Sequence, residues 1–276
     1  MAYEKIQRGY KRGGNKGMWI MAVVILLLLA AVIALLILGS PLQRDHAQAP
    51  SSSVTVTSQG PTEEQKAAMA EADQWYLKLV NQDHALTEDY NPELTVIHEK
   101  YNPSGLKFDS RAVQALNDMC AAAEEDGVSL VVISAYRSIS KQTSLYNNKV
   151  DRLIAQGRSR EDALVEAAAE VAIPGTSEHN TGLAVDFNST EQSFEDTEAC
   201  RWLKEHAEEY GFVNRFPKDK QELTKIIYEP WHYRYVTVEH AKKMNELDMC
   251  LEEYVPYLQN GGQPVSSDAA GSQVSQ

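Results

Sequence analysis

The sequence predicts a membrane-spanning helix followed by a folded region whose order of elements agrees with an α+β domain. Two observations lead to this prediction. Residues 18–38 form an unbroken apolar run, long enough to cross a bilayer as a helix at about 1.5 Å per residue. Beyond residue 62, amphipathic helical patterns are interrupted by a few short segments with the apolar alternation of strands.

Charge is distributed unevenly along the chain. The net charge is −13, but residues 1–17 contain five basic side chains and one acidic side chain. The positive-inside rule therefore predicts a cytoplasmic segment at 1–17, an anchor at 18–38 and an acidic domain outside the cell. A cleaved signal peptide is the alternative, although the apolar run is long and LGSPLQRD is a poor cleavage site. The acidic domain lacks the basic surface that nucleic-acid binding requires.

Composition also sets the expected domain boundaries. Residues 39–61 are rich in Ser, Gln, Thr and Pro and predict a flexible linker. The folded domain is expected at 62–257, and the Gly-, Gln- and Ser-rich residues 258–276 are expected to be disordered.

Helices are predicted where apolar residues recur at three- and four-residue steps between capping signals. Thr62, followed three residues later by Gln65, has the pattern of a capping box. The segment from 75 to 105 contains two Asn-Pro pairs and predicts extended segments and turns. The expected helices comprise 62–73, 110–127, 140–157, 159–171, 198–211 and 239–248, and the expected strands comprise 128–137, 183–187 and parts of 223–238.

Most histidines and all three cysteines have a structural or solvated interpretation. Cys120, Cys200 and Cys250 lie in helical patterns and are expected to pack in the core, with one pair bridged or none. His84 and His98 are not expected to bind metal, since the HExxH motif that His98 could begin has Asn at its last position. The two histidines of the later helices, His206 and His240, are expected to be solvated.

The segment 174–187, PGTSEHNTGLAVDF, has the composition of half a metal site. His179 and Asp186 would be two ligands, supplied by a turn that runs into a short strand. Gly182 would let the backbone fold back so that both side chains converge. A catalytic zinc usually has three protein ligands, so a third must come from elsewhere.

The segment EPWHYRYV offers the third ligand. In an extended or bulged strand, Glu229 and His232 would face one cavity, the imidazole to bind metal and the carboxylate to take a proton from water. Arg137 ends the buried strand predicted before it. It is either an ion-pair partner or a clamp for a substrate carboxylate or a developing oxyanion.

Three motifs, SAYRS, SEHNTGLAVD and EPWHYRYV, together resemble the VanY-like D-alanyl-D-alanine carboxypeptidases, relatives of the VanX dipeptidases and the hedgehog signalling domain. The resemblance covers about residues 77–257. It implies a small central antiparallel sheet with a zinc site on one face and helices around it. By this resemblance His179, Asp186 and His232 hold one Zn²⁺, Glu229 is the general base and Arg137 contacts the substrate carboxylate or oxyanion. The substrate pocket would include Ser177, Gln142, Tyr136 and Trp231.

The resemblance implies a membrane-anchored zinc carboxypeptidase that removes the terminal D-Ala from peptidoglycan stem peptides outside the cell. Two alternatives keep the zinc site: an L,D-carboxypeptidase that acts on tetrapeptide stems, and an inactive zinc-bearing module that binds the wall or signals. A third is a serine carboxypeptidase, because Ser138-Ile-Ser-Lys141 fits S-x-x-K. The sequence has no KTG or KSG triplet to complete that set.

Overall fold

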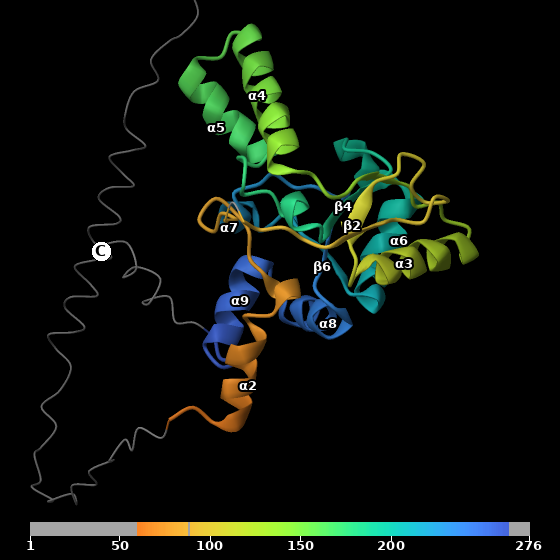
Figure 1. Cartoon of the computed structure of the whole chain (residues 1–276), viewed down its shortest axis with the longest axis vertical. Coiled ribbons are helices and arrows are strands. Elements are labelled where there is room, and N and C mark those ends of the chain that lie inside the picture. The colour runs from red at the N-terminus through yellow and green to blue at the C-terminus, as the bar shows by residue number, and fades with distance from the viewer. Residues whose placement is uncertain (1–59, 88, 265–276) are drawn as a thin grey trace, which may run out of the picture. The chain divides into compact units, whose positions relative to one another are not determined.

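The computed structural model describes residues 60–264, apart from residue 88 (Figure 1). The predicted cytoplasmic segment, the anchor at 18–38 and nearly all of the linker lie outside the described residues, as do residues 265–276. Within the described part of the chain, no helix combines the length and the apolar character needed to cross a bilayer.

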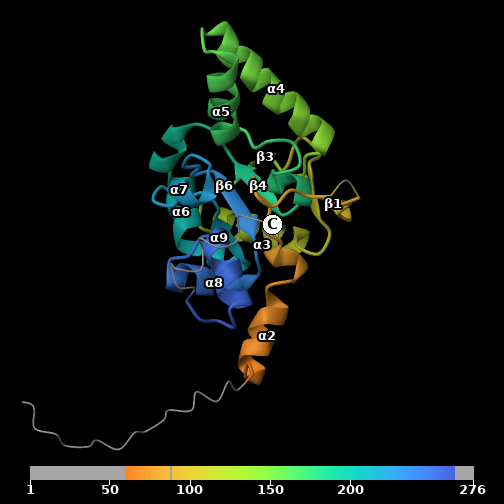
Figure 2. The same ribbon diagram turned by 90° about the vertical axis from the view of Figure 1, so that its left-hand side faces the viewer.

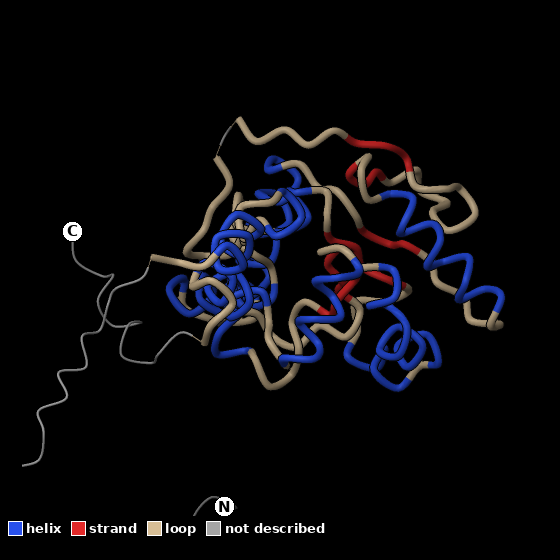
Figure 3. The backbone as a smooth tube through the Cα atoms, turned by 90° about the horizontal axis from the view of Figure 1, so that it is seen from below, coloured by secondary structure: helices blue, strands red, loops and turns tan. Residues whose placement is uncertain are grey.

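A four-stranded antiparallel sheet lies at the centre of the fold, with the strand order β3-β4-β6-β5. Its strands are β3 (Val132–Ser134), β4 (Ala184–Phe187), β5 (Phe212–Asn214) and β6 (His232–Tyr235). A second sheet pairs β1 (Leu94–Val96) with β2 (Lys107–Asp109). Seen from below, helices lie on several sides of the strands (Figure 3). The small antiparallel sheet that the family resemblance implied is confirmed.

The two faces of the central sheet differ in chemistry because side chains alternate along each strand. Val185 and Phe187 of β4, with Tyr233 of β6, belong to the main hydrophobic core. That core also contains side chains of α3 (Val113–Glu125) and α6 (Glu198–His206). The alternate residues of β4 and β6, among them Asp186 and His232, face the other way. One face is therefore free to carry polar groups.

Two further groups of helices flank the sheet. The helices α4 (Ile139–Ala155) and α5 (Arg160–Glu170) pack together through a small apolar cluster of their own, at the top of Figures 1 and 2. A third cluster joins α8 (Val238–Leu247) and α9 (Leu251–Gln259) to the segment that follows α2 (Glu63–Glu71). Among residues 60–264, the remaining helices are the short α7 (Gln221–Thr224) and four 3₁₀ helices, at Trp75–Leu77, Glu178–Thr181, Gln192–Asp196 and Ala207–Tyr210.

The capping signal at Thr62 and the stop at Gly211 are confirmed, whereas the helix expected from Ser110 begins three residues later, at Val113. Thr62 Oγ1 accepts a hydrogen bond from the backbone N–H of Gln65, whose side chain accepts one from the N–H of Thr62. The helix that was expected to stop at Gly211 consists of α6 and a 3₁₀ extension to Tyr210, and Gly211 follows with a φ of 83°.

The strands and the C-terminal region differ from the predictions. The strand expected at 128–137 forms a ladder only over β3. The segment 223–238, expected to supply strands, holds a single strand and the end of α7, while β5 and α9 were not predicted. Strand lengths were overestimated because the β propensity of a segment does not show where its hydrogen bonds to the neighbouring strand end. The last helix, α9, ends two residues beyond the expected domain end at Tyr257.

The burial of the cysteines and of two histidines can be compared with the predictions. All three cysteines are free and buried, as the core interpretation predicted. The prediction that His240 is solvated is wrong, because α8 packs against other helices there. Its Nδ1 lies 2.8 Å from the hydroxyl of Tyr254 and its Nε2 lies 3.1 Å from a carboxylate oxygen of Glu71. His206 is partly exposed, its side chain at 35%.

Candidate metal centre

His179 is placed by the turn that precedes β4. It belongs to the 3₁₀ helix Glu178–Thr181, which ends at Gly182 with a φ of 78°. A Cβ at Gly182 would lie 3.0 Å from the side chain of Leu94 and 3.3 Å from the backbone nitrogen of Asp109. Both the positive φ and the close packing therefore favour glycine. The turn into a short strand, as the sequence predicted, is confirmed.

The ring orientation of His179 is fixed by a backbone contact. Its Nδ1 lies 2.7 Å from the carbonyl oxygen of Ala135, to which an Nδ1–H can donate. The pKa of this imidazole is lowered to about 4, chiefly by burial and secondly by the positive charge of Arg137. The ring is thus neutral at neutral pH, with the Nε2 lone pair directed away from Ala135. A neutral imidazole held in this way is a typical metal ligand.

The sheet brings the other two predicted ligands together. Asp186 of β4 and His232 of β6 are cross-strand partners in the antiparallel register. Asp186 Oδ1 lies 3.1 Å from His232 Nδ1, and Asp186 Oδ2 lies 3.3 Å from His179 Nε2. One ligand atom from each of the three residues falls within 4.8 Å of the others. The three side chains therefore meet at one point, although His232 lies far from the other two in the sequence.

Buried atoms without partners show that these residues fit a cation. Among the described residues, His179 Nε2 and Asp186 Oδ1 have no hydrogen-bond partner. The approach of His232 Nδ1 to Asp186 Oδ1 is close but not aligned as a hydrogen bond, and His232 Nε2 also has no partner. A lone pair that faces a carboxylate inside a protein is unfavourable unless a positive ion lies between them. Two imidazoles and a carboxylate form a typical donor set for zinc.

Glu229 lies beside this cluster, but in a turn. The N–H of His232 donates to the carbonyl oxygen of Glu229, which closes the turn, so the extended or bulged strand predicted for this pair is wrong. The turn still brings Glu229 Oε2 to 3.4 Å from His232 Nδ1. Burial raises the pKa of the Glu229 carboxyl well above its usual range, and Asp186 raises it further, while Arg137 opposes them.

Arg137 directs its guanidinium at the same cluster. Its Nη2 lies 3.3 Å from Asp186 Oδ2, and its Nε and Nη1 donate to Ser134 Oγ and Gln142 Oε1. Burial lowers the pKa of Arg137, and the nearby carboxylates oppose that shift. Gln142 is fully buried, and its amide nitrogen donates to the carbonyl oxygen of Ala172. The structure thus places Gln142 behind Arg137, where it orients the guanidinium.

The predicted site residues share a cavity of about 830 Å³. Its walls include the three metal-site residues, Glu229 and Arg137, together with the predicted substrate contacts Ser177, Tyr136 and Trp231. Ser177 is buried and precedes the 3₁₀ helix that carries His179. The cavity therefore collects every predicted residue except Gln142 on one surface.

The comparison with known proteins agrees with this geometry. The family model VanY, described as D-alanyl-D-alanine carboxypeptidase, matches residues 105–238. A D-alanyl-D-alanine carboxypeptidase of Enterococcus faecalis is 41% identical over 182 residues, which cover 66% of this chain and 66% of the relative. The bifunctional D-Ala-D-Ala dipeptidase and D-Ala-D-Ala carboxypeptidase VanXYC of Enterococcus gallinarum is 32% identical, over 66% of this chain and 94% of its own length. This chain belongs to the VanY family.

Solved structures of VanY proteins share the fold. A VanY mutant from a VanB-type resistance cassette, in complex with Zn(II), is 40% identical with a TM-score of 0.59, over 66% of this chain and 99% of its own. VanYB in complex with D-alanine-D-alanine has 40% identity and a TM-score of 0.60, over 66% and 98%. The LD-carboxypeptidase LdcB has 34% identity and a TM-score of 0.57, over 64% and 84%. The chain therefore has a VanY/VanX-like peptidase fold.

The serine carboxypeptidase alternative finds no support in this VanY fold. Ser138 is the N-cap of α4, and its Oγ accepts a hydrogen bond from the backbone N–H of Lys141. The hydroxyl therefore has a structural role at a helix start.

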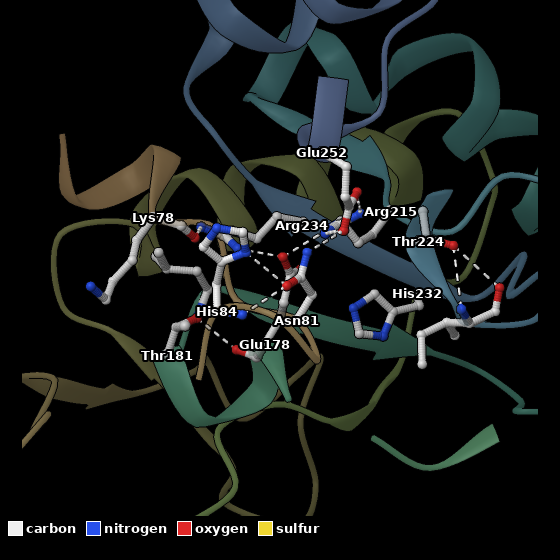
Figure 4. A network of polar contacts seen from close by, with 12 residues as sticks. Lys78, Asn81, His84, Glu178, Thr181, Arg215, Thr224, His232, Arg234 and Glu252 are labelled. Atoms are coloured by element: carbon white, nitrogen blue, oxygen red, sulfur yellow. Dashed lines mark hydrogen bonds and ion pairs between the residues drawn. The ribbon is translucent and has the colours of Figure 1, made fainter. Parts of the chain in front are cut away.

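A second buried polar group on this face was not predicted. Arg215 and Arg234 both donate to Glu178 Oε1, each at 2.7 Å, and Arg215 also binds both oxygens of Glu252 (Figure 4). A signal for Arg234 was available in HYRYV, because residues two apart on a strand share a face, and His232 was already assigned to the site. Arg215 follows a strand that was itself missed, so no comparable signal existed for it.

Proposed function

We propose that this VanY-family chain is a zinc-dependent D-alanyl-D-alanine carboxypeptidase that removes the terminal D-Ala from peptidoglycan stem peptides. The observation that carries the proposal is the convergence of His179, Asp186 and His232, with unsatisfied ligand atoms, beside Glu229 and Arg137. The D-Ala-D-Ala carboxypeptidase relatives and the Zn(II) complex of a VanY protein support both the substrate and the metal.

Zinc would be held by the two imidazoles and the Asp186 carboxylate. Three protein ligands leave a coordination position open, which is typical of catalytic rather than structural zinc sites. Bound zinc supplies an acidified water and polarises the scissile carbonyl. An inactive zinc-bearing module has no need of a buried carboxylate beside such a water, so Glu229 favours an enzyme.

The chain's own groups have distinct tasks in this reaction. Glu229 takes a proton from the attacking water and returns it to the leaving amine. Its high pKa, caused by burial, suits a group that must hold a proton between these two steps. Arg137 binds a negative group of the substrate, either the terminal carboxylate or the oxygen that gains charge as water attacks. The bonds from Arg137 to Ser134 and Gln142 hold its guanidinium in place before substrate binds.

The L,D-carboxypeptidase alternative keeps the same residues and changes the bond that is cleaved. The likeness to LdcB supports it, since that protein is an LD-carboxypeptidase. The VanYB complex with D-alanine-D-alanine favours the D,D-reaction at higher identity.

We extend the proposal to the location of the enzyme. The apolar run at 18–38 and the basic residues before it support a single-pass anchor with a cytoplasmic N-terminus. The polar residues 39–61 would then give the outward-facing domain reach to the cell wall.

Mass spectrometry of stem peptides tests the proposed reaction. Purified full-length protein is incubated with pentapeptide and tetrapeptide stems, with and without a metal chelator. We expect the pentapeptide to lose one D-Ala, and the chelator to stop the reaction until zinc is restored. Cleavage confined to the tetrapeptide would establish the L,D-alternative, and full activity in metal-free protein would rule out the metal mechanism.

The substitution Glu229→Gln tests the assigned base. We expect zinc to bind normally while kcat falls by about 100-fold or more, the usual range for the loss of a general acid or base. Glu222→Gln on α7 is the matched control, because Glu222 is exposed and lies outside the cavity lining. Equal turnover by the Glu229→Gln variant and wild type would show that another group moves the proton.

A further inference from the structure

One wall of the active-site cavity is a stripe of basic residues on α4. Lys141, Leu145, Lys149 and Arg152 all line the cavity that contains the metal centre. They are spaced by four, four and three residues, which places them on one face of the helix. A neighbouring stripe, made of Gln142, Tyr146, Val150 and Leu153, is buried. We call the cavity-facing set the α4 stripe.

The positive charge of the α4 stripe is only partly neutralised. Within the described part of the chain, Lys149 forms an ion pair with Glu170 at the end of α5. This leaves Lys141 and Arg152, both exposed, without an ion-pair partner among these residues. The other carboxylates of the cavity lining are Glu191 and the group around the metal centre, Glu178, Asp186 and Glu229. The α4 wall therefore carries excess positive charge on a chain whose net charge is −13.

The stripe also has the length of a short peptide. From Lys141 to Arg152 the helix rises by about 16 Å. A fully extended peptide of five residues spans about 17 Å. The stripe begins four residues after Arg137, the residue proposed to bind the substrate near the scissile bond. A stem peptide held at Arg137 could thus place its upstream residues along α4.

These observations concern the specificity of the proposed reaction, and they rest on that proposed function. We infer that the α4 stripe, through Lys141 and Arg152, binds free carboxylates on stem residues upstream of the scissile bond. The enzyme then favours stems whose third residue keeps a free carboxylate, as in diaminopimelate, over stems in which this carboxylate is amidated. A lysine at that position would meet like charge. A ligand in the same cavity as the metal centre is more simply the substrate itself than a separate wall polymer.

A matched pair of peptides tests this specificity. The two pentapeptide stems differ only in whether the side-chain carboxylate of diaminopimelate is free or amidated. With wild-type full-length protein we expect a kcat/KM about 3- to 10-fold higher for the free carboxylate, the range for one or two exposed ion pairs. The preference should lie in KM and should shrink as salt is added. In the variant Lys141→Gln/Arg152→Gln the ratio should fall close to one.

Lys242→Gln on α8 is the control, since Lys242 is exposed and outside the cavity lining. It should keep the wild-type ratio. Equal kcat/KM for the two peptides in wild type, or an unchanged ratio in the double variant, would overturn the inference. So would a double variant that lost affinity for a phosphate-rich wall polymer but treated both peptides as wild type does.

Binding separates this inference from the proposed reaction. Calorimetry with the Glu229→Gln variant gives the Kd of each uncleaved peptide, with and without the two α4 substitutions. A stripe-dependent preference in Kd, with no hydrolysis by wild type, would support the stripe and reject the carboxypeptidase proposal. Hydrolysis of both peptides with no preference in Kd would support the carboxypeptidase proposal and reject the role of the α4 stripe.

Discussion

Two clusters of buried charge meet at β6 and differ in how many of their polar atoms lack a hydrogen-bond partner. In the metal centre, ligand atoms of His179 and Asp186 have no hydrogen-bond partner among the described residues. In the arginine network, Arg215 binds two carboxylates, and Arg234 binds Glu178 and the carbonyl oxygens of Tyr76 and Lys78. Of the side-chain atoms of this network, Glu178 Oε2 alone has no partner among the described residues. His232 and Arg234 lie two residues apart on β6, so neighbouring positions on one face serve the two clusters.

The charge balance of the two clusters explains the difference. The network contains two arginines and two glutamates, Glu178 and Glu252, so its charges cancel without any ligand. The metal centre combines Asp186 and Glu229 with Arg137 and two imidazoles, of which His179 is neutral at neutral pH. Its lone pairs on nitrogen and oxygen are therefore available to bind a cation. A closed set of buried charges indicates structure, and an open set indicates a ligand.

Removing one charge from the network should cause the largest loss of stability. Glu178→Gln keeps the side-chain shape but leaves Arg234 without a carboxylate partner and Arg215 with Glu252 alone. Breaking a buried ion pair costs about 3–5 kcal/mol, and we expect the free energy of unfolding to fall by this amount. Denaturant unfolding of metal-free protein measures it.

The exposed Glu222 supplies the control for this prediction. Glu222→Gln should change the free energy of unfolding by no more than about 0.5 kcal/mol. A loss below about 1 kcal/mol for Glu178→Gln would mean that the two arginines tolerate an unbalanced charge, and the contrast between the clusters would fail.

The equivalent substitution in the metal centre should affect function instead. In Asp186→Asn, Arg137 loses one ionic partner but keeps its bonds to Ser134 and Gln142, so the unfolding free energy of metal-free protein should fall by less than in Glu178→Gln. Removing a residue that only hydrogen-bonds to a metal ligand lowers metal affinity or activity by about 10- to 100-fold. Removing the ligand Asp186 itself should therefore lower zinc affinity and activity by at least about 100-fold. Zinc competition with a coloured chelator and the stem-peptide assay measure the two losses. A variant that unfolded readily but bound zinc as wild type does would reverse the assignment.

The sequence could predict the metal centre because its ligands carry chemistry in short motifs. His179 and Asp186 flank a turn whose glycine is visible in the sequence, and His232 follows Glu229 by three residues. Helix starts were equally local, as Thr62 and Ser159 show: each accepts a hydrogen bond from a backbone N–H three residues later.

The arginine network could not be predicted because it depends on pairing between distant segments. Arg215 meets Glu178 only after β5 has paired with β6, and β5 is a three-residue strand without a clear alternation. His240 was misjudged for a related reason, since its charged sequence neighbours do not show that α9 covers it. Tertiary packing, rather than local sequence, decides both cases.

The smallest expected change in stability is the one caused by lowering the pH, which protonates Glu252. Burial alone would raise the pKa of the Glu252 carboxyl, but the adjacent Arg215 lowers it to about 2. A carboxyl with a depressed folded pKa stabilises the protein above its unfolded pKa of about 4.3, and this contribution is lost as the pH falls towards 2. With its partial exposure taken into account, the contribution is roughly 1–2 kcal/mol. The unfolding free energies of metal-free wild type and Glu252→Gln should therefore converge between pH 5 and pH 2.5. His179 also titrates in this range, but it does so in both proteins and cancels in their difference. A difference that stayed constant with pH would show that Glu252 is not held ionised by Arg215.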